Sequence, residues 1–123
     1  MKRHVERAGI ATALLLLSPL VAWSRPMQMM ESFPAAEAII DGNNEKFVVR
    51  FDGLVDHRTS RMWLTQGDRA VRTLTPLLDS APTVLFASSS RLPPGNYQLH
   101  WSVKSMPDGE LTDGSIPFPC RAR

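Results

Sequence analysis

The chain has 123 residues, of which 14 are Lys or Arg, 12 are Asp or Glu and only one is Cys. This length suits one domain with a single hydrophobic core. A lone cysteine excludes an internal disulfide, so the core must hold the fold together. The charges form no clustered basic run of the kind that binds nucleic acid, and we expect no nucleic-acid partner.

The first 24 residues have the pattern of a cleaved secretory signal. Lys2, Arg3 and Arg7 give a basic start, residues 8–21 are apolar, and small residues precede a cleavage point after Ser24. The apolar run is shorter than the ~20 residues that span a bilayer, so a permanent anchor is the less favoured alternative. We therefore predict that residues 1–24 are removed and that residues 25–123 form the exported domain. That domain is close to neutral, because three of the basic residues and one acidic residue lie in the signal.

The rest of the chain consists of short β-rich runs separated by turn residues. The clearest run is 97–104, where Tyr97, Leu99, Trp101 and Val103 alternate with polar residues, as in a strand with one buried face. Further runs lie at 46–51, 61–65, 70–74, 83–87 and 115–120. Their number and spacing predict an all-β, Ig-like Greek-key β-sandwich or barrel of roughly seven strands.

The last run, "SIPFPC" at 115–120, places Ile116, Phe118 and Cys120 on one face. Pro117 and Pro119 cannot donate hydrogen bonds to a neighbouring strand, so this strand is predicted to lie at a sheet edge or to be irregular. The expected core contains Phe51, Trp63, Leu85, Tyr97, Leu99, Trp101 and Phe118.

The stretch "SMPDGELTDG" at 105–114 holds three carboxylates and two glycines within ten residues. It is either an ordinary acidic hairpin or a metal-binding loop. No nucleophile elbow, zinc-protease motif or phosphate-binding loop occurs in the chain, so we expect neither an enzyme nor a catalytic substrate.

Three stretches resemble the CopC-type periplasmic copper-resistance proteins: "SFPAA" (32–36), "VVRFDGLVD" (48–56) and "LPPGNYQLHWSVKSMPDGELTDGSIPF" (92–118). The last is the most specific, because its residues follow the order of the family's C-terminal pattern. The matching residues are Tyr97, Trp101, Ser105, Asp108, Gly109, Gly114 and Phe118. The resemblance implies a CopC-like sandwich over residues 25–123, a periplasmic location and copper as the bound ion.

In that family, Cu(II) is held by a histidine that begins the mature chain and by the Asp and His of a D-x-H loop. Asp108 matches the Asp, whereas Glu110 stands where the His is expected, and the loop is one residue longer than usual. The segment after the signal, "RPMQMM", offers no histidine. We interpret 105–110 as a copper loop whose imidazole has been replaced. The alternative is that Asp108 and Gly109 serve only the turn and Glu110 is a solvated charge.

Methionines beside the expected N-terminal ligand offer a different donor. Met27 and Met29 would point to the same side of an extended segment, and thioethers favour Cu(I). Alternatively, Met29 or Met30 fills the core while Met27 frays. The candidate metal ligands are therefore Asp108, Glu110, Met27 and Met29, and the copper ion is Cu(I) or Cu(II).

The resemblance implies a periplasmic copper-binding protein of copper homeostasis or resistance, acting as carrier or buffer. It also suggests delivery to an inner-membrane copper transporter of the CopD type. The alternative is a CopC-like sandwich that has lost its metal and serves as a periplasmic protein-interaction domain. We expect a monomer in either case.

Overall fold

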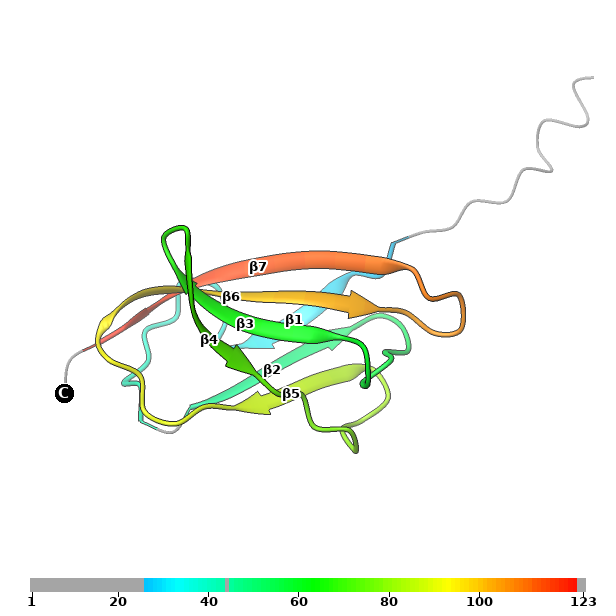
Figure 1. Ribbon diagram of the computed structural model, residues 1–123, viewed down its shortest axis with the longest axis horizontal. Coiled ribbons are helices and arrows are strands. Elements are labelled where there is room, and N and C mark those ends of the chain that lie inside the picture. The colour runs from blue at the N-terminus through cyan, green and yellow to red at the C-terminus, as the bar shows by residue number, and fades with distance from the viewer. Residues whose placement is uncertain (1–25, 44, 122–123) are drawn as a thin grey trace, which may run out of the picture.

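The computed structural model describes residues 26–43 and 45–121. Within them, seven strands form two antiparallel sheets and no helix is present (Figure 1). One sheet has the order β1-β2-β5, built from Met29–Phe33, Lys46–Phe51 and Val84–Ser88. The other has the order β4-β3-β6-β7, built from Arg69–Leu74, Arg61–Gln66, Gly95–Lys104 and Leu111–Cys120. The predicted all-β sandwich of about seven strands is confirmed.

The chain changes sheet between β2 and β3, between β4 and β5, and between β5 and β6. β3 pairs on one side with its hairpin partner β4 and on the other side with β6, which is distant in sequence. The predicted signal, residues 1–24, lies outside the described residues. In the described part of the chain, no helix is long and apolar enough to cross a membrane.

The core lies between the two sheets and follows the predicted alternation. In β6 the four odd-numbered residues from Tyr97 to Val103 are buried. Phe118 of β7 stacks on Tyr97 with ring centroids 5.6 Å apart, and Phe51 of β2 meets Trp101 edge-on at 6.1 Å. Such aromatic pairs add to the stability from burial, and the Phe51–Trp101 contact joins one sheet to the other, whereas Tyr97 and Phe118 belong to the same sheet. The predicted core residues that are buried are Phe51, Leu85, Tyr97, Leu99, Trp101 and Phe118.

The prediction that Trp63 belongs to the core is wrong. In β3 it is Met62 and Leu64 that are buried, so Trp63 between them faces outward. Its indole stacks on His100 with ring centroids 5.3 Å apart and an interplanar angle of 8°. His100 Nε2 lies 3.0 Å from Thr65 Oγ1. Trp63 and His100 therefore form an aromatic pair on the outer face of the four-stranded sheet.

β7 is an edge strand, as its prolines predict. The Pro117 and Pro119 carbonyls accept hydrogen bonds from the N–H groups of Glu37, at 2.8 Å, and Ile40, at 3.1 Å. These carbonyls point away from β6, and the backbone nitrogens at the same positions share that direction. The prolines thus occupy positions where the ladder to β6 needs no N–H, and β7 extends over ten residues despite them.

Candidate metal site

The β6–β7 loop, residues 105–110, is held in shape by Ser105. The Ser105 hydroxyl donates to Asp108 Oδ1 at 2.9 Å, and the Ser105 N–H donates to the Glu110 carbonyl at 2.9 Å. The Gly109 N–H donates to the Ser105 carbonyl at 2.8 Å. Gly109 has a φ of 72°, a left-handed conformation that favours a residue without Cβ. The loop therefore fixes the Asp108 carboxylate as a turn residue would.

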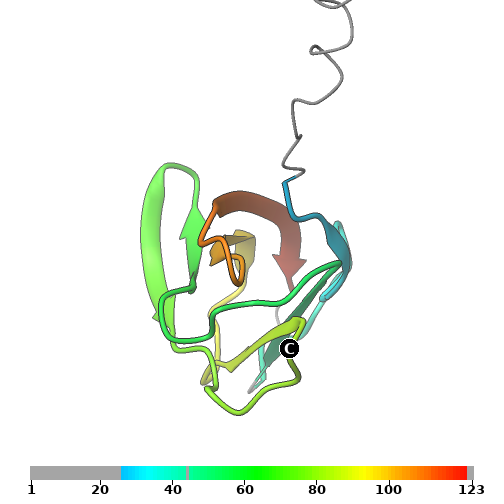
Figure 2. The same ribbon diagram turned by 90° about the vertical axis from the view of Figure 1, so that its right-hand side faces the viewer.

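Residues 52–54 join this loop to the N-terminal segment. The Met106 N–H donates to the Leu54 carbonyl at 3.0 Å. On the other side, the Gln28 N–H donates to Asp52 Oδ1 at 2.9 Å, and the Asp52 N–H donates to the Gln28 carbonyl at 3.0 Å. The N-terminal segment and the β6–β7 loop consequently meet at one end of the sandwich, which Figure 2 faces.

A pocket of about 180 Å³ lies where these segments meet, with walls that include Met27, Met106 and Asp108. Met27 is only 8% exposed, and its Sδ lies so close to Gly53 that a Cβ there would be 3.2 Å away. Met106 is 51% exposed and forms the solvent side. The pocket thus combines a buried thioether, an exposed thioether and two carboxylates, Asp108 and Asp52, of which Asp52 also accepts from the Gln28 N–H.

The structure places the four predicted ligands in two groups. Met27 and Asp108 share the pocket, whereas Met29 and Glu110 lie outside its walls. Met29 begins β1 and is 37% exposed, and Glu110 is an exposed residue whose carbonyl accepts from Ser105. The methionine that fills a buried position is Met27, not Met29 or Met30. Met106 was not among the predicted ligands, although it stands in the quoted loop two residues before Asp108.

The donor set decides which ions the pocket suits. Among the residues that the structure describes, no group of three or more His, Cys, Asp or Glu is placed to hold a metal ion. His57 lies elsewhere, with Nε2 2.8 Å from the Val84 carbonyl, and His100 is stacked on Trp63. The two thioethers suit a soft ion such as Cu(I), whereas the two carboxylates of the pocket walls, Asp52 and Asp108, are harder oxygen donors, and no imidazole is present in the walls.

The one cysteine lies at the other end of the sandwich. Cys120 is paired with Gly95, whereas the loop end of the same hairpin pairs Lys104 with Leu111. The Cys120 side chain is buried, with Sγ 3.7 Å from the Leu92 carbonyl. Burial, followed by the nearby Glu45 and Asp41 carboxylates, raises the pKa of the thiol and so disfavours the thiolate that binds metals.

The fold and the pocket define a small β-sandwich with a candidate metal site at one end. A family model described as the CopC domain matches residues 29–121, and the chain belongs to this family. The resemblance seen in the sequence is thereby confirmed. Among curated protein sequences, none matches the chain.

Two solved structures share the fold. CopC from Methylosinus trichosporium OB3b has a TM-score of 0.68 at 20% identity, with 80% of this chain and 96% of that chain covered. PcoC, a copper resistance protein from Escherichia coli, has a TM-score of 0.61 at 17% identity, with 76% and 99% covered. Family membership therefore relates the chain to copper-resistance proteins.

Proposed function

We propose that this chain is a periplasmic copper-binding protein of copper homeostasis or resistance, and that it binds Cu(I) at the pocket between the N-terminal segment and the β6–β7 loop. The observation that carries the proposal is the meeting of Met27, Met106 and Asp108 in one pocket of about 180 Å³. Membership of the CopC domain family supports copper as the ion and binding, rather than catalysis, as the role.

Each of the three side chains has a distinct part in this proposal. Met27 supplies a thioether from a rigid position, because Gly53 and the Gln28–Asp52 hydrogen bonds hold its segment. Met106 supplies a second thioether from the exposed side and has the freedom to approach or leave the ion. Asp108 supplies negative charge, which offsets the charge of a cation in the pocket.

An exposed thioether suits a protein that exchanges its ion. Met106 can release copper to an incoming ligand while Met27 and Asp108 keep hold of it, so transfer need not pass through free copper. We propose a carrier or buffer, with an inner-membrane copper transporter of the CopD type as the receiver. Export through a cleaved signal, residues 1–24, is part of this proposal.

The test is thermal unfolding of the purified protein with copper, kept as Cu(I) by ascorbate or left as Cu(II). Any ion that binds the folded state alone stabilises it, by about 2.7 kcal/mol at 100 times the Kd. We expect Cu(I) to raise the Tm more than Cu(II) does. The double variant Met27→Leu with Met106→Leu should lose most of the Cu(I) effect, and Asp108→Asn should weaken it.

Met30→Leu is the matched control, because Met30 is exposed on β1 and is not part of the pocket walls. Methionine-to-leucine changes conserve volume and cost under about 1.5 kcal/mol, so the variants should remain folded. An unchanged Cu(I) effect in the double variant would contradict the site.

A second candidate is a sandwich that has lost metal binding and acts as a periplasmic protein-interaction domain. It is favoured by one observation, that the described residues contain no cluster of three or more His, Cys, Asp or Glu placed for a metal. This candidate predicts no rise in Tm with either oxidation state of copper.

A further inference from the structure

The methionines within residues 26–43 and 45–121 differ widely in their exposure to solvent. Met62 and Met27 are buried, with exposed fractions of 1% and 8%, whereas Met29, Met106 and Met30 are 37%, 51% and 53% exposed. Of the three exposed methionines, Met106 is the one that lines the pocket at the loop end of the sandwich. The pocket therefore combines one thioether that is protected from reagents in solution with one that they can reach.

The backbone of Met106 is fixed, but its side chain takes no part in the core. The Met106 N–H donates to the Leu54 carbonyl at 3.0 Å, and the neighbouring Ser105 is held by its backbone bonds to Gly109 and Glu110. The Met106 side chain is not among the buried residues that pack between the sheets. A chemical change at this sulfur thus alters the pocket wall without disturbing the packing that stabilises the fold.

The electron pairs on a thioether sulfur serve both to bind a soft metal ion and to react with an oxidant. With hydrogen peroxide, a sulfur electron pair attacks one peroxide oxygen and the O–O bond breaks. That oxygen stays on sulfur as a sulfoxide, and the second oxygen leaves as water with the two peroxide protons. Sulfur gives up two electrons and peroxide takes them. The product presents a polar oxygen in place of a soft sulfur donor.

The side chains of the pocket walls offer such an oxygen no hydrogen bond. A sulfoxide oxygen is an acceptor, and the ionised carboxylates of Asp52 and Asp108 are also acceptors. Ser105 is the wall residue whose side chain carries a donor, and its hydroxyl donates to Asp108 Oδ1 at 2.9 Å. We therefore expect oxidised Met106 to turn out of the pocket into solvent, where water supplies the donors.

We propose that Met106 is a modification site, at which peroxide converts the thioether to a sulfoxide and so lowers the affinity of the pocket for Cu(I). The inference rests on the proposed function, because it concerns the regulation of the same pocket. A soft ion that occupies the pocket should in turn protect Met106, since the bound sulfur is no longer free to attack peroxide. Met27, being buried, keeps its thioether while Met106 is oxidised.

The test uses the variant Met29→Leu with Met30→Leu, which leaves Met106 as the exposed methionine of the described residues. The protein is treated with hydrogen peroxide in the presence of a chelator, and both reagents are then removed. Peptide mass spectrometry locates the sulfoxide, and titration against a chromophoric competitor measures Cu(I) affinity. Met106 should be oxidised before Met27, and affinity should then fall at least about threefold. The Tm without copper should stay unchanged.

Two variants and a reversal serve as controls. In the same background, Met106→Leu should bind Cu(I) weakly before peroxide and show no further loss after it. Met106→Gln, which places a polar oxygen near the position of the sulfoxide, should resemble the oxidised protein. Treatment of the oxidised protein with methionine sulfoxide reductases and a thiol, followed by removal of the thiol, should restore the affinity.

Protection by a bound ion is measured with Ag(I), a soft ion that peroxide does not oxidise. In the protein that retains Met29 and Met30, Ag(I) should slow the oxidation of Met106 at least about threefold and leave that of Met30 unchanged.

Equal Cu(I) affinity before and after oxidation of Met106 would overturn this proposal and leave the copper proposal standing. Oxidation of Met27 ahead of Met106, or equal protection of Met106 and Met30 by Ag(I), would also overturn it. Absence of Cu(I) binding by the untreated protein would overturn both proposals, so the two failures are distinguishable.

Discussion

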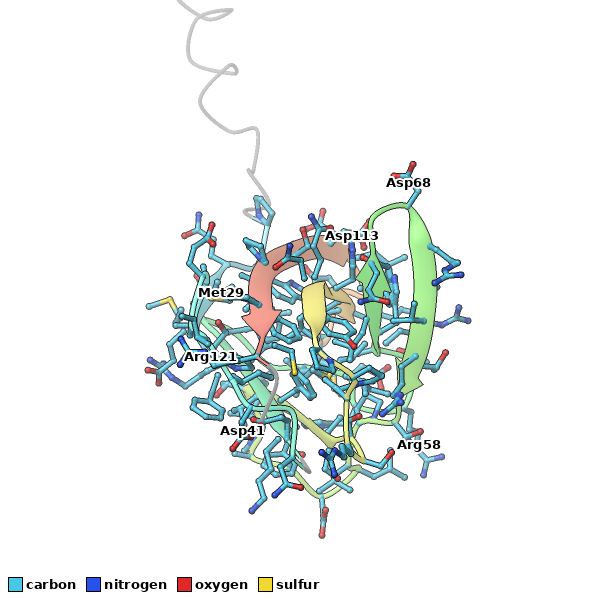
Figure 3. The ribbon with its side chains drawn as sticks, turned by 90° about the vertical axis from the view of Figure 1, so that its left-hand side faces the viewer. Met29, Asp41, Arg58, Asp68, Asp113 and Arg121 are labelled. Carbon is cyan, nitrogen blue, oxygen red and sulfur yellow. The ribbon has the colours of Figure 1, made fainter. Side chains whose placement is uncertain are left out.

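Both ends of the sandwich contain sulfur-bearing side chains, but the exposure of those side chains differs between the ends. At the loop end, Met106 is 51% exposed and shares a pocket with Met27 and Asp108. At the opposite end, Cys120 is 5% exposed, and Gly42 and Leu92 lie directly against it. Figure 3 faces that second end, where Asp41 and Arg121 lie close to the point at which β7 ends.

The difference indicates where a soft ion can bind. A thiolate is the stronger ligand for Cu(I), yet the thiol here is buried, its pKa is raised, and no cavity opens onto it among those described. The weaker thioether donors are the accessible ones. The comparison therefore indicates a packing role for Cys120 and supports the proposal that copper binds at the methionines.

Alanine substitutions at two glycines, each of which lies next to a sulfur atom, should distinguish the two ends most strongly. In Gly42→Ala, the new Cβ would lie 2.5 Å from Cys120 Sγ and 2.7 Å from the Leu92 carbonyl oxygen, at a φ of 77°. Overpacking and left-handed strain together should lower the free energy of unfolding by about 2–5 kcal/mol. Urea denaturation measures this loss.

Gly53→Ala is the corresponding substitution at the loop end. Its Cβ would lie 3.2 Å from Met27 Sδ, the end of a flexible side chain, and Gly53 has no positive φ. The cost should stay under about 1 kcal/mol, as for other tolerated core changes. Equal costs at Gly42 and Gly53 would mean that the two ends are packed alike.

The dependence of stability on alkaline pH should report on the burial of side chains at the end of the sandwich that contains Cys120. Burial is the main cause of the raised pKa values of Cys120 and Tyr97. The unfolded chain then loses these protons at a lower pH than the folded protein does. Stability is fully present below about pH 8.5 and falls as the pH rises through the folded pKa values. Cys120→Ala should flatten the fall in denaturation experiments between about pH 8 and pH 10, and an unchanged profile would contradict a buried thiol.

Most of the fold could be predicted from the sequence because alternation is a local signal. β2 was predicted with the bounds that the structure gives, and the other predicted strands differ by a few residues at their ends. β1 was missed because "MMESF" is exposed along nearly its whole length and shows no alternation. Trp63 was misplaced because "RMWLT" has large apolar residues on both faces, and the sequence does not say which face meets β2 and β5.

The site was only partly predictable because it depends on contacts between distant residues. Met27 and Met29 would share a side only in a regular strand, but β1 begins at Met29 and its register shifts between Met29 and Glu31. Met106 reaches the pocket through its backbone bond to Leu54, a contact that no local pattern encodes. Asp108 was predicted from the family pattern, and the structure places it in the walls of the pocket.

The most direct test is a Cu(I) titration against a chromophoric competitor, carried out on the parent protein, on Cys120→Ala and on the double variant Met27→Leu with Met106→Leu. We predict that Cys120→Ala binds Cu(I) like the parent and that the double variant binds it at least about tenfold more weakly, a loss of about 1.4 kcal/mol. Loss of Cu(I) binding in Cys120→Ala, with the double variant unaffected, would place the ion at the opposite end of the sandwich and contradict the proposed site.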